Sequence, residues 1–545
     1  MKRTRFALVA ATVLVIGLSQ AVMAGPSHIP SATGSKFRPL AATPEVAAGR
    51  GNQAGVQDSK TPSKLECRAT GDPSANVNLD CDGLTPNNEP NIVVDPVDPL
   101  HMVASSNDYE SCCDQFYTTF DGGATWTTGN MSTETPTPLG PIGSDPVTTF
   151  DTKHNMTLHS SLNFYSNPSF TETCNGDVVV SPSSDGGATW DKPAVVDKGV
   201  GCDLSRLQLF NDKEWITTDN NPGSKFFGRT YVTWTKFESH AGGFFRSAIF
   251  ESHSDDGGKH WTGAQEISGA NATLCTEQVS GPAGQCDEDQ FSVPTVGPDG
   301  TVYVAFENSQ NAALNEQGEV GDSQYLLVKS TNGGATWANP TFVVGLEDGS
   351  NDYPLNVDGR QTLTGYQTRV NSAGNIVAGP SGSLFLTFSD NRNGIHDVAH
   401  PVTNIDVFVV SSTNGGGTWS GPSLVDSGHD DQWFPWVDVN PITGKIGVAY
   451  NDRGNSNGTP YNATIAEGMP GSFVQTTVST ASSDPVHSEF FKAGADAPTC
   501  VECARFNGDY IGLAYGSDGH ANATWTDMRD VTPDGHAEFI YFGRK

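Results

Sequence analysis

Short runs of alternating apolar and polar residues recur along most of this chain. The clearest runs form an apolar strand, a turn that often carries Asp-Pro or Gly, and a second apolar strand, as in 90–108, 291–308 and 434–452. A further short alternating strand follows, for example GDVVV at 176–180 and DVFVV at 406–410. Runs of this length bounded by turn residues predict β-strands, so the pattern indicates an all-β protein built from repeated hairpins.

A second repeated pattern follows these third strands and has the form Ser/Thr-x-Asp/Asn-x-Gly-x-x-Trp. Asp or Asn accepts backbone N–H groups in a tight turn, and Gly takes the backbone conformation with positive φ. The Trp supplies a large apolar surface with one N–H donor. We therefore interpret the pattern as a structural strand-turn-strand element, with key positions Asp121, Trp126, Asp185, Trp190, Asp256, Trp261, Asn332, Trp337, Asn414 and Trp419.

Counting the hairpins gives more units than counting the turns. First strands are predicted to begin near Asn88, Asp145, Asp212, Gln290, Gln367, Gln432 and Gly508. Repeated units of four short antiparallel strands are typical of a β-propeller, here with seven blades, and the repeats are too short for an array of β-sandwiches. The sixth turn is degenerate, with Phe473 in place of Trp, and the last unit ends after its third strand. We expect residues 75–80 to supply the missing strand and close the ring.

The N-terminal part of the chain predicts export. Residues 1–24 have a basic start, an apolar run and small residues before the cut, as in a secretory signal peptide. Residues 25–74 are predicted to be a flexible leader and 75–545 to be the propeller. No second apolar run approaches membrane length, so we expect a secreted (extracellular or periplasmic) protein without membrane insertion.

Charge and cysteine content fit this location. A formal net charge of -32 argues against binding nucleic acid. We also expect the protein to be a monomer. The 10 cysteines of an exported chain favour disulfides. Neighbours in sequence suggest Cys67 with Cys81, Cys174 with Cys202 and Cys275 with Cys286. The remaining Cys112, Cys113, Cys500 and Cys503 should form disulfides across the ring closure, with a four-thiolate zinc site as the alternative.

The five turns resemble the Asp box, or BNR repeat, of the sialidase superfamily. The resemblance covers the chain from about Asn87 to Lys545 and implies that the turns join strands three and four on the face away from the active site. Sialidases usually have six blades, so a six-bladed propeller is the alternative to the seven-bladed one. By resemblance, the protein is a glycoside hydrolase acting on carbohydrate or glycoprotein, with no required cofactor.

Strand order places one set of residues on the opposite face. The starts of first strands and the ends of second strands surround the propeller axis, where ligands bind. The first-strand starts carry Glu89, Asp145, Asp212, Glu214, Glu288, Asp289, Arg369, Asp431 and Asp509. The second-strand ends carry Asp108, Glu307, Asp390 with Arg392, Asp452 with Arg453, and Asp527 with Arg529. Each Asp–Arg pair can equally be interpreted as a local ion pair that orders its loop and does not contact a ligand.

The resemblance suggests roles for some of these residues. Sialidases use three Arg on the substrate carboxylate, a Tyr nucleophile assisted by Glu, and an Asp acid/base. The catalytic candidates are therefore Asp108, Tyr510 and Glu288. The substrate-binding candidates are Arg369, Arg392, Arg453, Arg529, Trp433 and Asp431.

One position departs from the family pattern. Where sialidases open the first blade with Phe-Arg-Ile-Pro, this chain has Glu89 before Pro90 and no Arg. A carboxylate there would repel a sialate, so a changed substrate is one hypothesis. A non-catalytic propeller that binds glycan, protein or calcium is the other. The metal is unknown from sequence, with calcium as the candidate.

Overall fold

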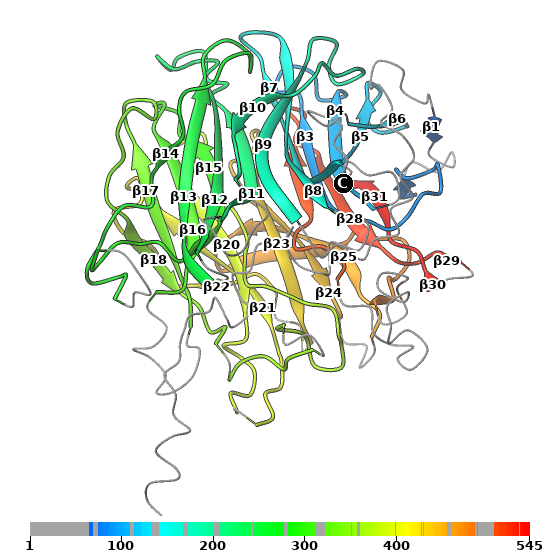
Figure 1. The fold of residues 1–545 in the computed structure, drawn as a ribbon. Helices are drawn as coiled ribbons and strands as arrows, with labels where there is room; N and C mark the ends of the chain where they lie inside the picture. Colours follow the sequence, from blue (N-terminus) through cyan, green and yellow to red (C-terminus); the bar gives the residue numbers. More distant parts are fainter. Residues whose placement is uncertain are drawn as a thin grey trace, which may run out of the picture.

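The computed structural model is a seven-bladed β-propeller in which the chain passes once around the ring (Figure 1). It describes residues 65–68, 75–109, 114–131, 141–166, 173–200, 208–240, 243–276, 282–310, 322–349, 351–356, 360–397, 399–426, 428, 430–454, 459–485, 488, 506–532 and 535–545. All named elements in these segments are strands. No helix of the described residues is long and apolar enough to cross a membrane.

The first four blades each contain four antiparallel strands in chain order. Blade 1 has β3 (Asn87–Val94), β4 (Met102–Asp108), β5 (Gln115–Thr119) and β6 (Thr125–Asn130). Blade 2 has β7 (Pro141–Asp151), β8 (Met156–Ser166), β9 (Thr173–Ser183) and β10 (Ala194–Asp197). Blade 3 has β11 (Gln208–Thr218), β12 (Thr230–His240), β13 (Gly243–Ser254) and β14 (Gln265–Glu266). Blade 4 has β15 (Asp289–Val296), β16 (Val302–Asn308), β17 (Gln324–Ser330) and β18 (Thr341–Gly345).

The remaining blades keep this order, except at the closure. Blade 5 has β19 (Ile376–Ala378), β20 (Leu384–Asp390), β21 (Asp406–Ser412) and β22 (Ser423–Leu424). Blade 6 has β23 (Gln432–Val439), β24 (Ile446–Asp452), β25 (Asn462–Met469) and β26 (Ser472–Thr477). Blade 7 has β27 (Gly512–Tyr515), β28 (Ala521–Asp527), β31 (Phe539–Arg544) and, as its outer strand, β2 (Val77–Asn78). A small hairpin, β29 (Val531–Thr532) and β30 (Gly535–His536), lies between β28 and β31.

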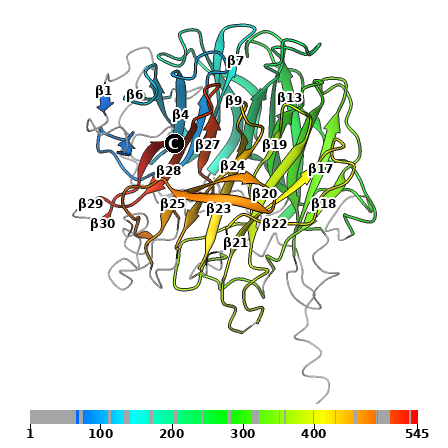
Figure 2. The same ribbon diagram turned by 180° about the vertical axis from the view of Figure 1, so that it is seen from behind.

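The ring closes as the sequence predicted, because β2 from the N-terminal side pairs with C-terminal strand β31. Figure 2 shows β28 and the C-terminus beside the first blade. Asp80, which follows β2, is fully buried and its Oδ2 accepts the Ile540 backbone N–H at 2.5 Å. The Tyr117 hydroxyl of blade 1 donates to the same carboxyl group. One side chain thus joins the first blade, the last blade and the N-terminal segment.

Two expectations change in detail. Strand β1 (Leu65–Arg68) pairs with β6 as a fifth strand of blade 1, so the sheet begins within the predicted leader. In blade 5 the predicted first strand near Gln367 is irregular, and β19 begins only at Ile376. Arg369 therefore lies in the connection before the strand. The rest of the predicted leader and the predicted signal peptide lie outside the described residues.

Two predicted disulfides are present, Cys67–Cys81 and Cys275–Cys286. The first links β1 to the segment just after β2, and therefore fastens the closing strand. The other predicted pairings, and the zinc alternative, involve Cys112, Cys113, Cys202, Cys500 and Cys503, which lie outside the described residues.

The five Asp boxes form nearly identical turns between the third and fourth strands. In blade 2, Asp185 Oδ1 accepts the Thr189 N–H at 2.9 Å, and Ser183 Oγ accepts the Gly187 N–H at 2.8 Å. Asn332 keeps the same backbone bond and its Nδ2 donates to Thr336 Oγ1 at 2.8 Å, which replaces the charge by an amide. The repeated motif is therefore a folding element at the far end of each blade from the first-strand starts.

The closure gives a stability prediction. Replacing Asp80 by Ala leaves the Ile540 N–H buried without its acceptor, at about 1–3 kcal/mol, while the Tyr117 hydroxyl can still donate to Gln115 Oε1 at 2.9 Å. We expect a clearly lower midpoint in denaturant unfolding. Asp98→Ala is the control, because Asp98 accepts only an exposed turn N–H from Leu100 in the described structure. Equal midpoints for the two variants would show that Asp80 does not secure the ring.

Candidate active site on the propeller axis

In six of the seven blades a residue in the left-handed conformation lies within the innermost strand or, in blade 7, just before it. The residues are Glu89 (φ 57°), Asp145 (55°), Lys213 (55°), Phe291 (57°), Phe434 (55°) and Gly508 (89°). In the five non-glycine cases the residue lies at a β-bulge that shifts the register with the second strand. This conformation costs a non-glycine residue about 1–2 kcal/mol. Bulges of this kind re-aim side chains next to functional sites.

Several of these strand starts place charged side chains together near the axis. We define the axial cluster as Glu89, Asp145, Lys213, Glu214, Arg369, Asp509 and Tyr510, all less than 5% exposed. The sequence register had brought six of these seven residues to this face, and it missed Lys213. Of the six residues with positive φ, only Gly508 could have been recognised from the sequence, because glycine favours positive φ.

Arg369 and Asp509 form the one fully paired unit of the axial cluster. Arg369 Nη2 and Nε donate to the two Asp509 carboxylate oxygens at 2.8 and 3.3 Å. Asn371 Nδ2 donates to Asp509 Oδ1 at 3.0 Å. Burial alone would raise the pKa of Asp509, but the charges of Arg369 and Lys213 hold that pKa below its usual value. Asp509 is therefore ionised.

Glu89 and Glu214 have the opposite tendency. Burial and then the charge of Asp145 raise the pKa of each side chain well above that of an exposed Glu. Glu89 Oε2 accepts a hydrogen bond from Asn107 Nδ2 at 2.8 Å, whereas neither carboxyl oxygen of Glu214 has a hydrogen-bond partner. Burial thus raises the pKa of two carboxyl groups in the cluster, whereas neighbouring positive charges lower that of Asp509.

Lys213 and Tyr510 are in direct contact. The Lys213 ammonium lies 3.3 Å from the centroid of the Tyr510 ring, and neither Lys213 Nζ nor the Tyr510 hydroxyl has a hydrogen-bond partner. Trp215 packs edge-on against Tyr510, with ring centroids 5.3 Å apart. Burial, followed by the charges of Glu89 and Asp145, raises the pKa of Tyr510 well above its usual value.

The space inside the cluster is small. A cavity of about 10 Å³ lies among Lys213, Trp215, Phe291, Trp436, Asp509, Tyr510 and their neighbours, which is room for about one water molecule. A second cavity of about 10 Å³ lies beside blades 5 to 7. Its lining includes Thr368, which precedes Arg369 of the axial cluster, and Asn507, two residues before Asp509.

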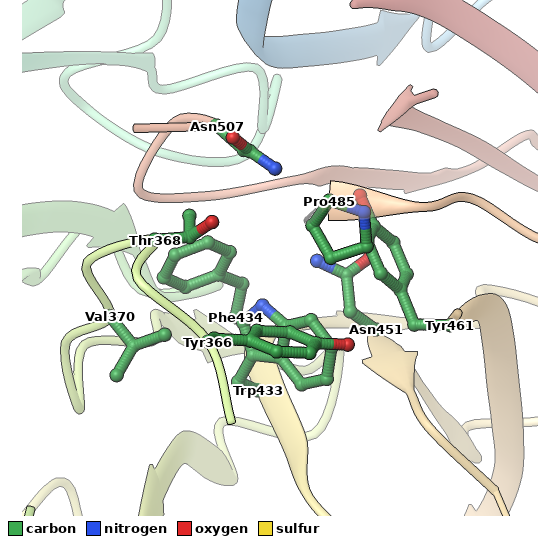
Figure 3. Close-up of a pocket in the computed structure, with 9 residues that line it drawn as sticks. All are labelled: Tyr366, Thr368, Val370, Trp433, Phe434, Asn451, Tyr461, Pro485 and Asn507. Carbon is green, nitrogen blue, oxygen red and sulfur yellow. The ribbon is translucent and has the colours of Figure 1, made fainter. Parts of the chain in front are cut away.

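The second cavity is walled by aromatic rings (Figure 3). Trp433 lies edge-on between Tyr461 and Tyr366, with centroid distances of 5.0 and 6.0 Å. Figure 3 shows the amide of Asn507 pointing towards the space above Trp433. Asn451 Oδ1, at the same cavity, is buried without a hydrogen-bond partner. Flat rings and polar side-chain groups are the lining from which ligand pockets are usually built.

Three predicted substrate-binding arginines form local ion pairs instead of converging. Arg392 pairs with Asp390 at 2.6 Å, Arg453 with Asp431 at 2.6 Å, and Arg529 with Asp527 at 2.5 Å. Each guanidinium also lies over an aromatic ring of its own surroundings, as Arg453 lies over Tyr366. Within the described structure these pairs match the loop-ordering interpretation.

Two predicted catalytic residues have their described contacts away from the axial cluster. Asp108 Oδ2 accepts a hydrogen bond from Asn130 Nδ2 at 2.8 Å, at the outer strand of blade 1. Glu288 is buried before β15, and its Oε2 accepts a hydrogen bond from Ser309 at 3.3 Å. Of the three catalytic candidates, the structure places only Tyr510 in the axial cluster, and the roles of all three stay predictions.

With fold and site described, comparison with known proteins adds the following. No protein-family model and no curated protein matches this chain. Similar solved structures include the α-L-arabinanase of Penicillium chrysogenum, at 13% identity over 76% of this chain and 100% of that chain (TM-score 0.44). They also include the leech intramolecular trans-sialidase, at 11% identity over 82% and 83% (TM-score 0.40). An α-L-arabinofuranosidase of Fusarium graminearum is 10% identical over 72% and 92% (TM-score 0.43).

Sialidases, an α-L-arabinanase and an α-L-arabinofuranosidase are thus among the similar solved structures. Similarity at these TM-scores assigns neither an activity nor a substrate to this chain. Its function has to be inferred from its own residues.

The unpaired carboxyl of Glu214 gives a pH-dependent prediction. Because folding raises the pKa of Glu214, its ionisation favours the unfolded chain, and stability from this site is lost as pH rises above 4.5. Glu214→Gln removes the ionisation, so the variant should melt higher than wild type near pH 7–8. We expect the melting temperature of the variant to exceed that of wild type by a margin that grows as pH rises. The difference should shrink to nothing below about pH 4.

Melting temperatures across this pH range test the prediction. The measurements below about pH 4 are the internal control, because the wild-type carboxyl is then protonated in the folded and in the unfolded chain. Identical pH profiles for Glu214→Gln and wild type would contradict the buried, proton-retaining state of Glu214.

Proposed function

We propose that this protein is a secreted glycoside hydrolase whose acid–base chemistry takes place at the axial cluster. The observation that supports this proposal most strongly is the set of buried ionisable groups without hydrogen-bond partners: Lys213 Nζ, both Glu214 carboxyl oxygens and the Tyr510 hydroxyl. Burying such groups is costly, and a cluster with only a structural role would be more stable if it were apolar. Unpaired ionisable groups with shifted pKa values are typical of catalytic sites.

The division of pKa values suggests roles. Carboxyl groups whose surroundings shift their pKa values in opposite directions are the pattern of acid–base pairs in hydrolases. Glu89, which retains its proton, is proposed to protonate the leaving-group oxygen. Asp509 is ionised and fixed by Arg369, so its proposed role is to stabilise positive charge that develops on the sugar. Tyr510 is proposed as the nucleophile, provided that a neighbouring carboxylate accepts its proton.

The charge of the cluster bears on the substrate. It contains four carboxyl groups and only two cationic side chains, one of which is paired with Asp509. The candidate arginines outside the cluster are neutralised by their own Asp partners. An acidic sugar would therefore meet Glu89 without a free guanidinium, and we propose a neutral glycan as substrate, with the rings around Trp433 as a stacking surface.

Export belongs to the same proposal. The signal-peptide pattern of residues 1–24, the net charge of -32 and the disulfides Cys67–Cys81 and Cys275–Cys286 all suit a protein that works outside the cytoplasm.

The proposal predicts activity on neutral glycosides that depends on the axial cluster. Purified protein should hydrolyse at least one member of a panel of neutral oligosaccharides and aryl glycosides, and sialosides more slowly or not at all. Glu89→Gln and Tyr510→Phe should each lower kcat by about 10²-fold or more, because each removes a proton-transfer or nucleophilic group. Released reducing sugar is the measurement.

Asp185→Asn is the matched control, because Asn332 and Asn414 show that an amide supports the same turn. It should keep wild-type activity. Full activity of both Glu89→Gln and Tyr510→Phe would exclude the axial cluster as the catalytic site.

A second candidate function is non-catalytic binding, and one observation favours it. The roomiest described groove, of about 290 Å³, lies on the Asp-box face and not at the axis. Its lining includes Asp95, His101, Phe120, Phe150 and Asp185. Glycan-array binding that survives Glu89→Gln but is lost in Phe120→Ser, without any hydrolysis, would support this function over the first.

A further inference from the structure

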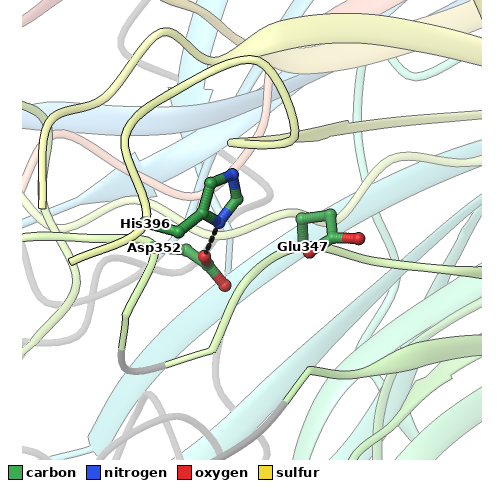
Figure 4. Close-up of side chains that lie close together, drawn as sticks. All are labelled: Glu347, Asp352 and His396. Atoms are coloured by element: carbon green, nitrogen blue, oxygen red, sulfur yellow. Dashed lines mark hydrogen bonds and ion pairs between the residues drawn. The ribbon is translucent and has the colours of Figure 1, made fainter. Parts of the chain in front are cut away.

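Two loops beside blade 5 bring three metal-ligating side chains together (Figure 4). Glu347 and Asp352 lie in the connection from β18 to β19, and His396 lies in the loop between β20 and β21. Each residue offers one ligand atom, and these atoms all lie within 4.8 Å of one another. The group is separate from the axial cluster, and its members were not among the residues selected from the sequence.

The three side chains are arranged unequally. The Asp352 carboxyl is fully buried and bonded to His396 Nδ1, while the His396 side chain is 35% exposed. Figure 4 shows the Glu347 carboxyl beside this pair, with no bond drawn to it. Within the described structure no residue donates a hydrogen bond to that carboxyl group.

The backbone around the three residues is fixed by other bonds. The Glu347 N–H donates to Asp390 Oδ2 at 3.0 Å, and the Asn391 N–H donates to the Glu347 carbonyl at 3.1 Å. The Asn391 side chain donates to the Asp352 carbonyl, and the Gly349 N–H donates to Asp352 Oδ2 at 2.6 Å. The two loops are thus joined by backbone and Asn391 bonds in addition to the His396–Asp352 pair, and the Glu347 carboxyl takes no part in joining them.

The charges in this region call for a cation. Burial and then the charges of Asp352 and Asp390 raise the pKa of Glu347. Arg392, the nearest described guanidinium to these carboxylates, is already paired with Asp390. A divalent ion between Glu347, Asp352 and His396 would remove the repulsion between the first two.

Comparison within the chain distinguishes this group from ordinary His–carboxylate pairs. His101 pairs with Asp95, His154 with Asp151, His253 with Glu251 and His260 with Asp256. In the described part of the chain only the His396 pair has a third ligand atom close enough to share an ion.

We propose that Glu347, Asp352 and His396 bind a divalent transition-metal ion of the Zn²⁺ type. Zinc accepts imidazole nitrogen and carboxylate oxygen at about 2.0–2.2 Å, and three protein ligands leave a coordination position for water or substrate. Calcium and magnesium prefer oxygen-only ligand sets, so the imidazole selects against them. The ion would join the two loops beside blade 5.

The test is zinc titration of the full-length, tag-free mature protein after treatment with EDTA. Isothermal titration calorimetry with ZnCl₂ should show one strong site, while CaCl₂ and MgCl₂ should give no comparable heat. Zinc at 100 times its Kd should also raise the melting temperature, because binding only the folded chain then adds about 2.7 kcal/mol.

His396→Ala and Glu347→Gln should each weaken zinc binding at least tenfold. Both variants should still fold, because the Asn391 bonds join the two loops even when the His396–Asp352 pair is lost. His260→Ala is the matched control, since it removes the imidazole of an exposed His–Asp pair and should leave the strong site intact. Absence of a strong zinc site in wild type, or its survival in His396→Ala, would overturn the proposal. Both readouts are independent of hydrolase activity.

Discussion

Pairing of β2 with β31 is the interaction on which the rest of the structure depends. In a propeller each blade packs only on its two neighbours, so one open junction leaves two blades without a partner. Here a two-residue strand closes that junction, and its short hydrogen-bond ladder is supplemented by Asp80, by the Cys67–Cys81 disulfide and by Arg544, which donates to the Gly122 carbonyl of blade 1. The closure also determines the site, because Glu89 opens blade 1 and Asp509 opens blade 7. Those two carboxyl groups meet only in a closed ring.

The two ends of the blades meet their polar requirements in different ways. At the Asp-box end, side chains within each turn accept its backbone N–H groups, and neighbouring blades add single bonds to several turn carbonyls. At the axial end, buried groups come from separate blades and several have no partner. Stability is thus concentrated where the chain repeats, and costly groups are concentrated where the repeats differ. Because the Asp-box turns stabilise their blades, the axial end can contain residues in the left-handed conformation and buried charged groups without loss of the fold.

Most of the architecture could be predicted from the sequence, because it rests on local signals. Asp boxes fixed the strand register, hairpin counting gave seven blades, and the missing last strand indicated residues 75–80. The axial cluster was located in outline, since strand order decides which ends meet. Side-chain detail was less accessible: the sequence left open whether Arg392, Arg453 and Arg529 reach a common site or form local ion pairs, and in the structure each is paired with a nearby Asp. Lys213 was missed because a bulge, and not strand alternation, directs it to Tyr510.

Blade 5 is where the repeat is broken, and the break places chemistry at two points. A regular inner strand would begin near Gln367, but the chain from Leu346 to Asn375 forms a long connection before β19. Long connections in compact domains are usually functional. This one brings Arg369 to the axis, where it binds Asp509, and it holds Glu347 and Asp352 opposite His396. A regular strand could not serve both positions, because its alternation would direct neighbouring side chains into the packing between blades. The short β19 is therefore the structural consequence of a connection that serves the axis at one end and the proposed zinc site at the other.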